Sequence, residues 1–490
     1  MTIGLAVRFR EASQGPAYRW WVLAAVECGN FVVYMDGFIV TLALPAMARQ
    51  FGVGIHEIKW VLVAYLATLT VTLLLAGRLA DRWGRKPMTV VGMALLTLGA
   101  ALCALAPTLP VLVACRVLQG LGGALVLANV MAEITAIFPR EERRRAMAVN
   151  ASVLAMGQIT GLVFGGFLID RLGWRSIFLV ILVIGGLGLL LDLAVLRNRH
   201  TTGPSAPMDR WGGVLSILVV GAPFLLIEGL SRLTGPVTLA VPLAGLILLG
   251  LFVMVERRSA WPLLDLRLLR SRAFTCGSIA AAFYFIVATF GYFLMPLYAQ
   301  IVLGLSPFFA GLLIVPLSVA LTVSSQLVGR MAGRFSARIV STAGLICTSI
   351  GVLGMSLLGP KPSYAYMVGM LILAGVGGGL FHPPNNSSVL SGVPPQDLGG
   401  ANGFFTTARN FGQAIGAALA ATILGHGLGP SGATEVLAWV PGAMAGGPSM
   451  DAYVQAHAFA FRVGAALGLV GAVISALRGS EIPSAPPPGA

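Results

Sequence analysis

The chain has 490 residues, of which 57% are hydrophobic and 10% are charged, and its mean hydropathy is +0.88. Soluble domains carry about 25% charged residues, so this composition excludes a soluble protein and indicates a polytopic membrane protein. The net charge of +14 does not indicate a nucleic-acid partner, because the cations are scattered between apolar runs. The five cysteines show no disulfide or metal spacing and no phosphate-binding loop motif occurs. We therefore expect no metal, no cofactor and no ATP-driven step.

Fourteen apolar runs are long enough to cross a bilayer, since a transmembrane helix needs about 20 residues. We expect spans at about 19–44, 56–76, 88–108, 109–137, 144–170, 174–196, 210–232, 236–256, 274–301, 307–328, 336–358, 363–390, 399–425 and 457–477. Most of the 32 Lys and Arg residues fall in alternate connecting segments, and cations are retained on the cytoplasmic side. The pattern predicts a multi-pass protein of the cytoplasmic (inner) membrane, with both termini cytoplasmic.

The first span carries two acids, Glu27 and Asp36. An ionisable group within hydrocarbon is costly, and it indicates function unless it makes a structural contact between helices. The two acids are nine residues apart, so they lie on nearly opposite faces of a helix. They cannot both face one cavity unless the helix is broken or rotated near Gly29 or Gly37, and either acid is a candidate for carrying a proton.

A short cationic segment, 77–87, separates the second and third spans, and it also holds a carboxylate and two glycines. Retention of cations on the cytoplasmic side during membrane insertion explains the Lys and Arg residues, but it does not explain the carboxylate or the glycines. The pattern resembles the loop 2–3 signature of the major facilitator superfamily, in which the loop latches the cytoplasmic ends of two halves. The residues that this resemblance assigns to a conformational gate are Gly77, Asp81, Arg82, Gly84, Arg85 and Lys86.

The fourth span contains Arg116 and Gln119 in an Arg-x-x-Gln-Gly pattern that resembles another signature of the superfamily. A lone Arg in hydrocarbon requires a partner, and we expect Asp36, since the first and fourth helices line one cavity in the family. Segment 35–45 also resembles the first-helix signature of the fourteen-span drug:proton antiporter branch, although Phe38 stands where that pattern has a polar Thr. This match favours Asp36 for proton coupling, with Arg116 and Glu27 tuning it.

The fifth span carries four glycines in a pattern that resembles the antiporter signature of the family: Gly157, Gly161, Gly165 and Gly166. Small residues let helices approach closely. The family has Pro after the second glycine, where this chain has Leu162, so the strictness of antiport is left open.

Two internal echoes indicate a parallel duplication. Segment 329–338 repeats 77–86 with Gly333 in place of Asp81, and 412–416 repeats 157–161. The offsets, 252 and 255 residues, are too long for six spans, so we expect a six, two, six arrangement. The expected units are a six-helix bundle at 19–198, a two-helix insert at 209–257 and a second six-helix bundle at 274–478. This all-α architecture of 14 transmembrane helices, with a long outer loop at 426–456, resembles the antiporter branch.

The second bundle offers further candidates for the substrate cavity. Tyr284 and Tyr292 belong to an aromatic stripe that forms either a packing surface or a wall for drug-like substrates. Asn385 and Asn386 follow a Gly- and Pro-rich stretch that predicts a discontinuous helix near a binding site. Asp192, near the end of the sixth span, is expected to be interfacial.

The resemblance implies a proton-coupled exporter of small amphipathic molecules, cationic ones among them, that acts as a monomer. No nucleophile–base constellation indicates an enzyme. Two alternatives stay open: an exporter dedicated to one metabolite or antibiotic, and a non-transporting sensor on the same fold.

Overall fold

The structure is a computed structural model that describes residues 18–197, 210–230, 237–259, 266–331, 335–394, 398–438 and 448–479. All of its described elements are helices. They are α2 (Tyr18–Phe51), α3 (Ile55–Ile58), α4 (Trp60–Trp83), α5 (Arg85–Leu105), α6 (Leu109–Ile137), α7 (Arg140–Leu172), α8 (Arg175–Val195), α9 (Arg210–Leu230), α10 (Val237–Arg258), the 3-10 helix η1 (Leu266–Arg270), α11 (Arg272–Ile301), α12 (Pro307–Arg330), α13 (Ala337–Met355), α14 (Tyr364–Ser391), α15 (Leu398–Ala438) and α16 (Pro448–Ala476).

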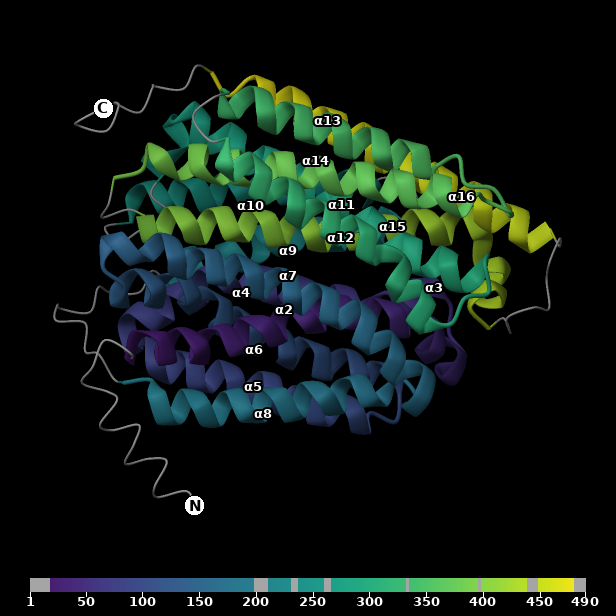
Figure 1. Ribbon diagram of the computed structural model, residues 1–490, viewed down its shortest axis with the longest axis horizontal. Coiled ribbons are helices and arrows are strands. Elements are labelled where there is room, and N and C mark those ends of the chain that lie inside the picture. The colour runs from purple at the N-terminus through teal and green to yellow at the C-terminus, as the bar shows by residue number, and fades with distance from the viewer. Residues whose placement is uncertain are drawn as a thin grey trace.

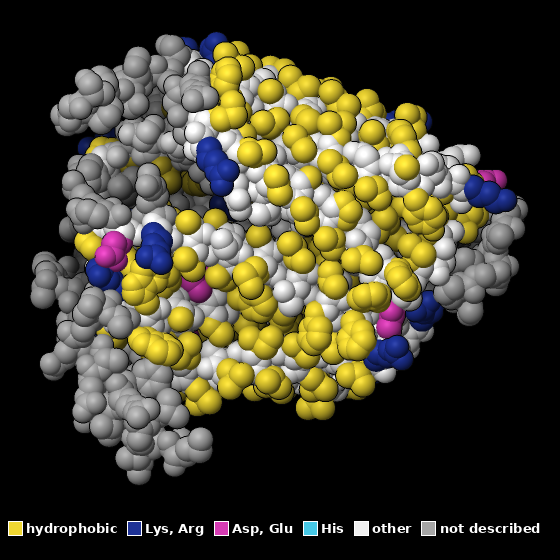
Figure 2. Space-filling view, in the orientation of Figure 1, with side chains coloured by type: hydrophobic (Ala, Val, Ile, Leu, Met, Phe, Trp, Pro, Cys, Tyr) yellow, Lys and Arg dark blue, Asp and Glu magenta, His cyan; other side chains and the backbone are white. Residues whose placement is uncertain are grey.

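The long helices run side by side in two groups (Figure 1). One half contains α2 and α4–α8, and the other contains α11–α16. Hydrophobic side chains cover the middle of the visible face, while Lys, Arg, Asp and Glu lie toward its two ends (Figure 2). Such a surface suits a bilayer, whose hydrocarbon accepts apolar side chains and excludes charges.

Twelve helices in the described part of the chain are long and apolar enough to cross a membrane. The predicted number of fourteen is not confirmed, because α9 and α10, at the seventh and eighth expected spans, are not among the twelve. Helix α9 packs against α10, and it also contacts both halves. Gly213 faces Leu75 of α4, and the Phe224 ring lies 6.1 Å from that of Phe411 in α15.

The segment between the second and third spans is much shorter than expected. Helix α4 continues to Trp83 and α5 begins at Arg85, so the turn is a single residue, Gly84. Gly84 has φ +96°, a conformation that L side chains rarely adopt, which explains why a glycine stands there. The prediction of a loop over 77–87 was wrong because polar residues extended both helices beyond the apolar runs.

The prediction that Gly and Pro interrupt the twelfth span is also wrong, since α14 is one continuous helix with Pro383 and Pro384 inside it. Its glycines serve helix packing instead. Gly375 meets the backbone of Leu317 in α12, and Gly377 meets Thr348 in α13. Small residues at these contacts let the helix axes come close.

The expected outer loop at 426–456 is partly helical, because α15 runs to Ala438 and α16 begins at Pro448. Several other predictions cannot be compared with the structure. Gly333 in the second copy of the gate motif, and the expected unit boundaries at 198 and 209, lie outside the described residues.

The two halves meet closely between α7 and α12. Gly311 packs on the carbonyl oxygen of Leu162, and a Cβ at Gly166 would lie 2.5 Å from the carbonyl oxygen of Pro307. The carboxylate of Asp170 accepts hydrogen bonds from the Ser306 hydroxyl at 2.7 Å and the Phe308 amide at 3.2 Å. Asp170 therefore caps the N-terminus of a helix in the other half, where a negative charge is favoured.

Two further hydrogen bonds join the halves at the same end of the bundle. Lys59 Nζ donates to Thr422 Oγ1 at 3.0 Å, and Gln300 Nε2 donates to the carbonyl oxygen of Leu42 at 3.2 Å. These contacts lie near the C-terminal end of α2, opposite the end where Tyr18 begins the described chain. The halves are thus closed against each other at one end of the bundle.

We expect Gly311→Ala to lower the melting temperature of the purified protein, because the new Cβ would overlap the Leu162 carbonyl and overpacking costs about 1–3 kcal/mol. The matched control is Gly186→Ala in α8, where no atom lies within 4 Å of an added Cβ. Alanine favours a helix over glycine by about 1 kcal/mol, so the control should be neutral or stabilising. An unchanged melting temperature for Gly311→Ala would contradict the close approach of α7 and α12.

Candidate functional site

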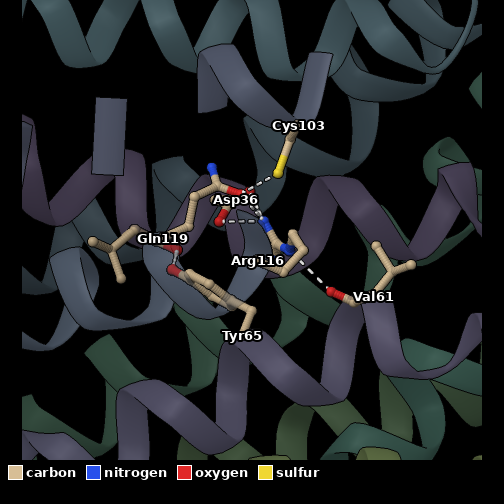
Figure 3. Close-up of polar contacts among 7 residues, drawn as sticks. Asp36, Val61, Tyr65, Cys103, Arg116 and Gln119 are labelled. Carbon is tan, nitrogen blue, oxygen red and sulfur yellow. Dashed lines mark hydrogen bonds and ion pairs between the residues drawn. The ribbon is translucent and has the colours of Figure 1, made fainter. Parts of the chain in front are cut away.

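An ion pair buried in the first half forms the centre of the candidate site (Figure 3). Nη1 of Arg116 in α6 lies 2.7 Å from Oδ1 and 2.8 Å from Oδ2 of Asp36 in α2. Both side chains are 0% exposed. The predicted pairing of Arg116 with Asp36 is therefore confirmed, and it links the first and fourth spans in the interior of the bundle.

Arg116 is held by three more neighbours. Its Nε donates to the carbonyl oxygen of Val61 in α4 at 2.9 Å, and Nη1 donates to Oε1 of Gln119 at 2.8 Å. Its Cζ lies 4.2 Å from the ring centroid of Tyr65, a cation–π distance. The hydroxyl of Tyr65 in turn donates to the carbonyl oxygen of Val33 at 3.1 Å. The guanidinium thus ties α2, α4 and α6 together.

The hydrogen bonding of this network is incomplete. Cys103 Sγ donates to Gln119 Oε1 at 3.2 Å, but Arg116 Nη2 and Gln119 Nε2 have no hydrogen-bond partner among the described residues. A buried donor without an acceptor costs about 1–3 kcal/mol, more when it is charged. A change of protonation or conformation could therefore give Arg116 Nη2 and Gln119 Nε2 the hydrogen-bond acceptors that they lack here.

Glu27 has a separate environment, as its helical spacing from Asp36 leads one to expect. Its carboxylate accepts hydrogen bonds from Asn30 at 2.9 Å and from Asn150 of α7 at 2.8 Å. The side chain is 4% exposed. Glu27 joins α2 to α7, whereas Asp36 joins α2 to α6.

The antiporter-like glycines lie along α2. A Cβ at Gly157 would lie 2.9 Å from the carbonyl oxygen of Phe31, and one at Gly161 would lie 2.8 Å from that of Met35. Gly165 meets the side chain of Ile39, while Gly166 faces α12 in the other half. The expected close approach of helices at this motif is confirmed, and it places α7 beside the backbone next to Asp36.

The residues of the predicted gate are anchored within the first half. Arg85 Nη1 donates to the carbonyl oxygen of Ala132 in α6 at 2.9 Å. Lys86 Nζ donates to the carbonyl oxygens of Leu196 and Leu193 at the end of α8, at 2.5 and 3.3 Å. Asp81 and Arg82 are exposed, and no atom lies within 4 Å of a Cβ added at Gly77. A latch between the halves remains a prediction for these residues.

The aromatic candidates of the second half are buried. The Tyr292 ring lies 5.1 Å from that of Phe38 across the two halves, and the Tyr284 ring stacks on Phe381 at 4.9 Å. Both tyrosines line a cavity of about 10 Å³ between α11, α12, α13 and α14. Drug-sized ligands need about 300 Å³ or more, so this cavity does not hold one in the conformation described.

The polar candidates differ in their surroundings. Asn385 donates to the carbonyl oxygen of Gly277 at 3.2 Å and accepts a hydrogen bond from Arg478. Asn386 is half-buried, and its Oδ1 has no hydrogen-bond partner in the described part of the chain. Gln119 belongs to the network around Arg116.

Sequence reasoning missed Tyr65 and Cys103, which only the packing brings to this network, and it did not predict the burial of Asp192. That carboxyl is 0% exposed, and its oxygens accept no hydrogen bond from the described groups. Its expected place at the membrane interface remains a prediction, because position along a helix gives depth in the membrane, whereas burial depends on which helices pack around it.

The sequence profile of the Major Facilitator Superfamily matches residues 26–417. The chain belongs to this superfamily. Its relatives include the multidrug resistance protein Stp of Mycobacterium tuberculosis (strain CDC 1551 / Oshkosh), 35% identical over 82% of this chain and 75% of that protein. Another is the cephamycin export protein CmcT of Amycolatopsis lactamdurans, 33% identical over 81% of this chain and 83% of that protein.

The fold also matches that of solved transporter structures. A bacterial homolog of the human lysosomal transporter Spinster, crystallised in an inward-facing and occupied conformation, superposes with a TM-score of 0.66 at 17% identity. The match covers 95% of this chain and 97% of that one. The superfamily consists of membrane transporters rather than enzymes, so this chain is a multi-pass membrane transporter whose partner is a small molecule.

We expect Asp36→Asn to destabilise the protein by about 3–5 kcal/mol, because removing one member of a buried ion pair leaves the other charge uncompensated. Replacing both partners, as in Asp36→Leu with Arg116→Met, should recover much of that loss. Thermal unfolding of Asp36→Leu, Arg116→Met and the double variant measures the coupling between the residues. Additive effects of the two single changes would show that the pair does not act as a unit.

Proposed function

We propose that this chain is a proton-coupled exporter that moves amphipathic drug-like molecules out of the cytoplasm across the cytoplasmic membrane. The observation that carries the proposal is the buried pair of Asp36 and Arg116. A carboxyl in the interior of a membrane bundle, matched to one cation, is a group whose protonation alters the balance of the site. The relative named as a multidrug resistance protein supports the class of substrate.

In the proposed cycle, Asp36 takes a proton and the ion pair is lost. Arg116 then keeps only the Val61 carbonyl and Gln119 as acceptors, in an interior where an unpaired charge is costly. Relief requires a rearrangement of α2 against α4 and α6, so proton binding favours a different packing of the first half. The proton changes the relative populations of the two conformations, which is the energetic content of coupling.

Helix α2 is positioned to carry that rearrangement to the other half. Phe38, two residues after Asp36, contacts Tyr292 of α11, and the carbonyl oxygen of Leu42 accepts from Gln300. On its other side Gly161 of α7 packs on Met35. A shift of α2 near Asp36 therefore changes contacts within the first half and between the halves.

We assign the end of the bundle where the halves meet to the outer side of the membrane. The support is the concentration of Lys and Arg in the segments on the other side, including 77–87, which favours a cytoplasmic location for both termini. In this assignment Asp170 and the α7–α12 contact form the outer closure, and Arg85 and Lys86 belong to the inner gate. The leucine at 162 faces Gly311 through its carbonyl oxygen, so close packing at this closure does not require the motif proline.

We also propose that α9 and α10 cross the membrane as a pair, giving fourteen spans in a six, two, six order. The apolar composition of both helices supports this, as does the contact of α9 with α4 and α15 on the two halves. The transporter would act as a monomer, since each chain carries both halves.

A dedicated exporter of one antibiotic or metabolite is the second candidate. It is favoured by the similarity to a relative named for cephamycin export, at 33% identity over 81% of this chain. The resistance profile of cells that express the protein separates the candidates: broad resistance indicates multidrug export, and resistance to one compound class indicates dedicated export.

We expect Asp36→Asn to lower efflux of an ethidium-like cation, driven by an imposed pH gradient in proteoliposomes, by at least about tenfold, or about 1.4 kcal/mol in the barrier. The reason is that an amide cannot take up and release the coupling proton. Glu27→Gln is the matched control, being the same change of acid to amide in the same helix. Its gradient-driven flux should stay near that of the wild type.

The reverse result, loss of flux in Glu27→Gln alone, would move proton coupling to Glu27. Absence of any gradient-driven flux of the cation in the wild type would contradict proton-coupled multidrug export and favour the dedicated exporter or a sensor.

A further inference from the structure

Arg409 is a cation inside a membrane-spanning helix of the second half. It lies nine residues after Gly400, the start of the apolar span of α15, or about 13 Å along the helix. The side chain is half-buried, and its Nε has no hydrogen-bond partner among the described residues. Its Cζ lies 4.8 Å from the ring centroid of Phe285 in α11 and 5.9 Å from that of Phe405.

The second half supplies no carboxylate to neutralise this cation. The sequence contains no Asp or Glu between Asp265 and Asp397, so α11, α12, α13 and α14 carry none. In α15 the acid is Glu435, which is 26 residues, or about 39 Å, further along the helix. In α16 it is Asp451, in the first turn.

Two interior acids of the first half have other partners, and the third, Asp192, lies in α8 near the Lys86 ammonium. Asp36 is bound to Arg116, and Glu27 accepts hydrogen bonds from Asn30 and Asn150. Contact with aromatic rings compensates a cation only in part, at about 0.5–2 kcal/mol. A guanidinium within hydrocarbon therefore has a demand for negative charge that the described protein groups do not meet.

The groups around Arg409 suit an aromatic ligand with an acidic end. The ring of His382 in α14 lies 5.3 Å from that of Phe285, so an imidazole and an aromatic ring stand beside the cation, and all three side chains are half-buried. A guanidinium has a planar set of N–H groups that binds a carboxylate through two parallel hydrogen bonds. Aromatic rings beside it offer stacking surfaces for an apolar ring system.

We propose that Arg409, with Phe285 and His382, binds the anionic oxygen group of an aromatic carboxylate or sulfonate, a substrate class that this transporter accepts besides cationic compounds. The binding itself rests on the geometry of α11, α14 and α15, and only the direction of transport rests on the proposed function. Cationic compounds are disfavoured at this wall by like charge, so an ethidium-like cation would bind elsewhere in the transporter.

The test uses three probes that share one ring system: 9-anthracenecarboxylate, its uncharged carboxamide and 9-(aminomethyl)anthracene, which is cationic at neutral pH. Equilibrium dialysis against the full-length purified protein at pH 7.5 gives their dissociation constants. We expect the carboxylate to bind at least about tenfold more tightly than either other probe. Arg409→Gln should abolish that preference while leaving the affinity for the carboxamide unchanged.

Two further variants separate charge from folding. Arg409→Lys keeps the charge without the planar fork, and it should retain a smaller preference for the carboxylate. Arg462→Gln removes an exposed arginine of α16 in the same half and should change nothing. Unaltered carboxamide binding and melting temperature show that a variant is folded. If Arg409→Gln does not fold, the proposal is tested by comparing the preference for the carboxylate in the wild type with that in Arg409→Lys, and an undiminished preference in Arg409→Lys would overturn it.

The proposal is overturned if the wild type binds none of the probes, binds all three equally, or prefers the cation. It is equally overturned if folded Arg409→Gln keeps the preference for the carboxylate. These outcomes do not depend on proton coupling, which the ethidium flux measures. Loss of coupling with an intact preference would contradict only the proposed function.

Discussion

Every charge that this bundle holds within the membrane needs a compensating charge or a set of hydrogen bonds, and Arg116 is the strictest case. It is fully buried, and its carboxylate partner comes from another helix. Breaking such a pair is expensive, although forming it adds little net stability, since both charges lose their hydration. The pair is thus better suited to switching between states than to holding one state together. In the proposed cycle, the packing of α2, α4 and α6 changes with the protonation state of Asp36.

Close helix packing connects the helices around Asp36 to the other half of the molecule. Gly161 and Gly157 place α7 directly on the backbone of α2, and Gly311 places α12 on α7. Contacts of this kind have little free volume, so a helix that moves must move its neighbours. The glycines therefore make a chain of rigid contacts from the interior of one half to the surface of the other.

The two halves differ in how they treat charge. The first half buries two acids beside matched partners, Asp36 with a guanidinium and Glu27 with two amides, and a third, Asp192, that accepts no hydrogen bond from the described groups. The second half has an arginine against aromatic rings and no interior acid, as its acid-free stretch from 266 to 396 dictates. The two halves thus have different electrostatic environments, and in our proposals the first binds a proton and the second an anionic group.

The sequence alone determined the class of protein, the approximate positions of the twelve candidate spans and the family, because apolar runs of about 20 residues and the motif at 77–86 are local features. It also predicted the partner of Arg116, since few acids lie deep in any span. The tertiary structure decided what depends on neighbouring helices: the burial of Asp192, the ring of Tyr65 under the guanidinium, and the continuity of α14. A sequence rich in glycine and proline looks the same whether these residues break a helix or let a second helix pack closely against it. Only the position of the neighbouring backbone distinguishes the two.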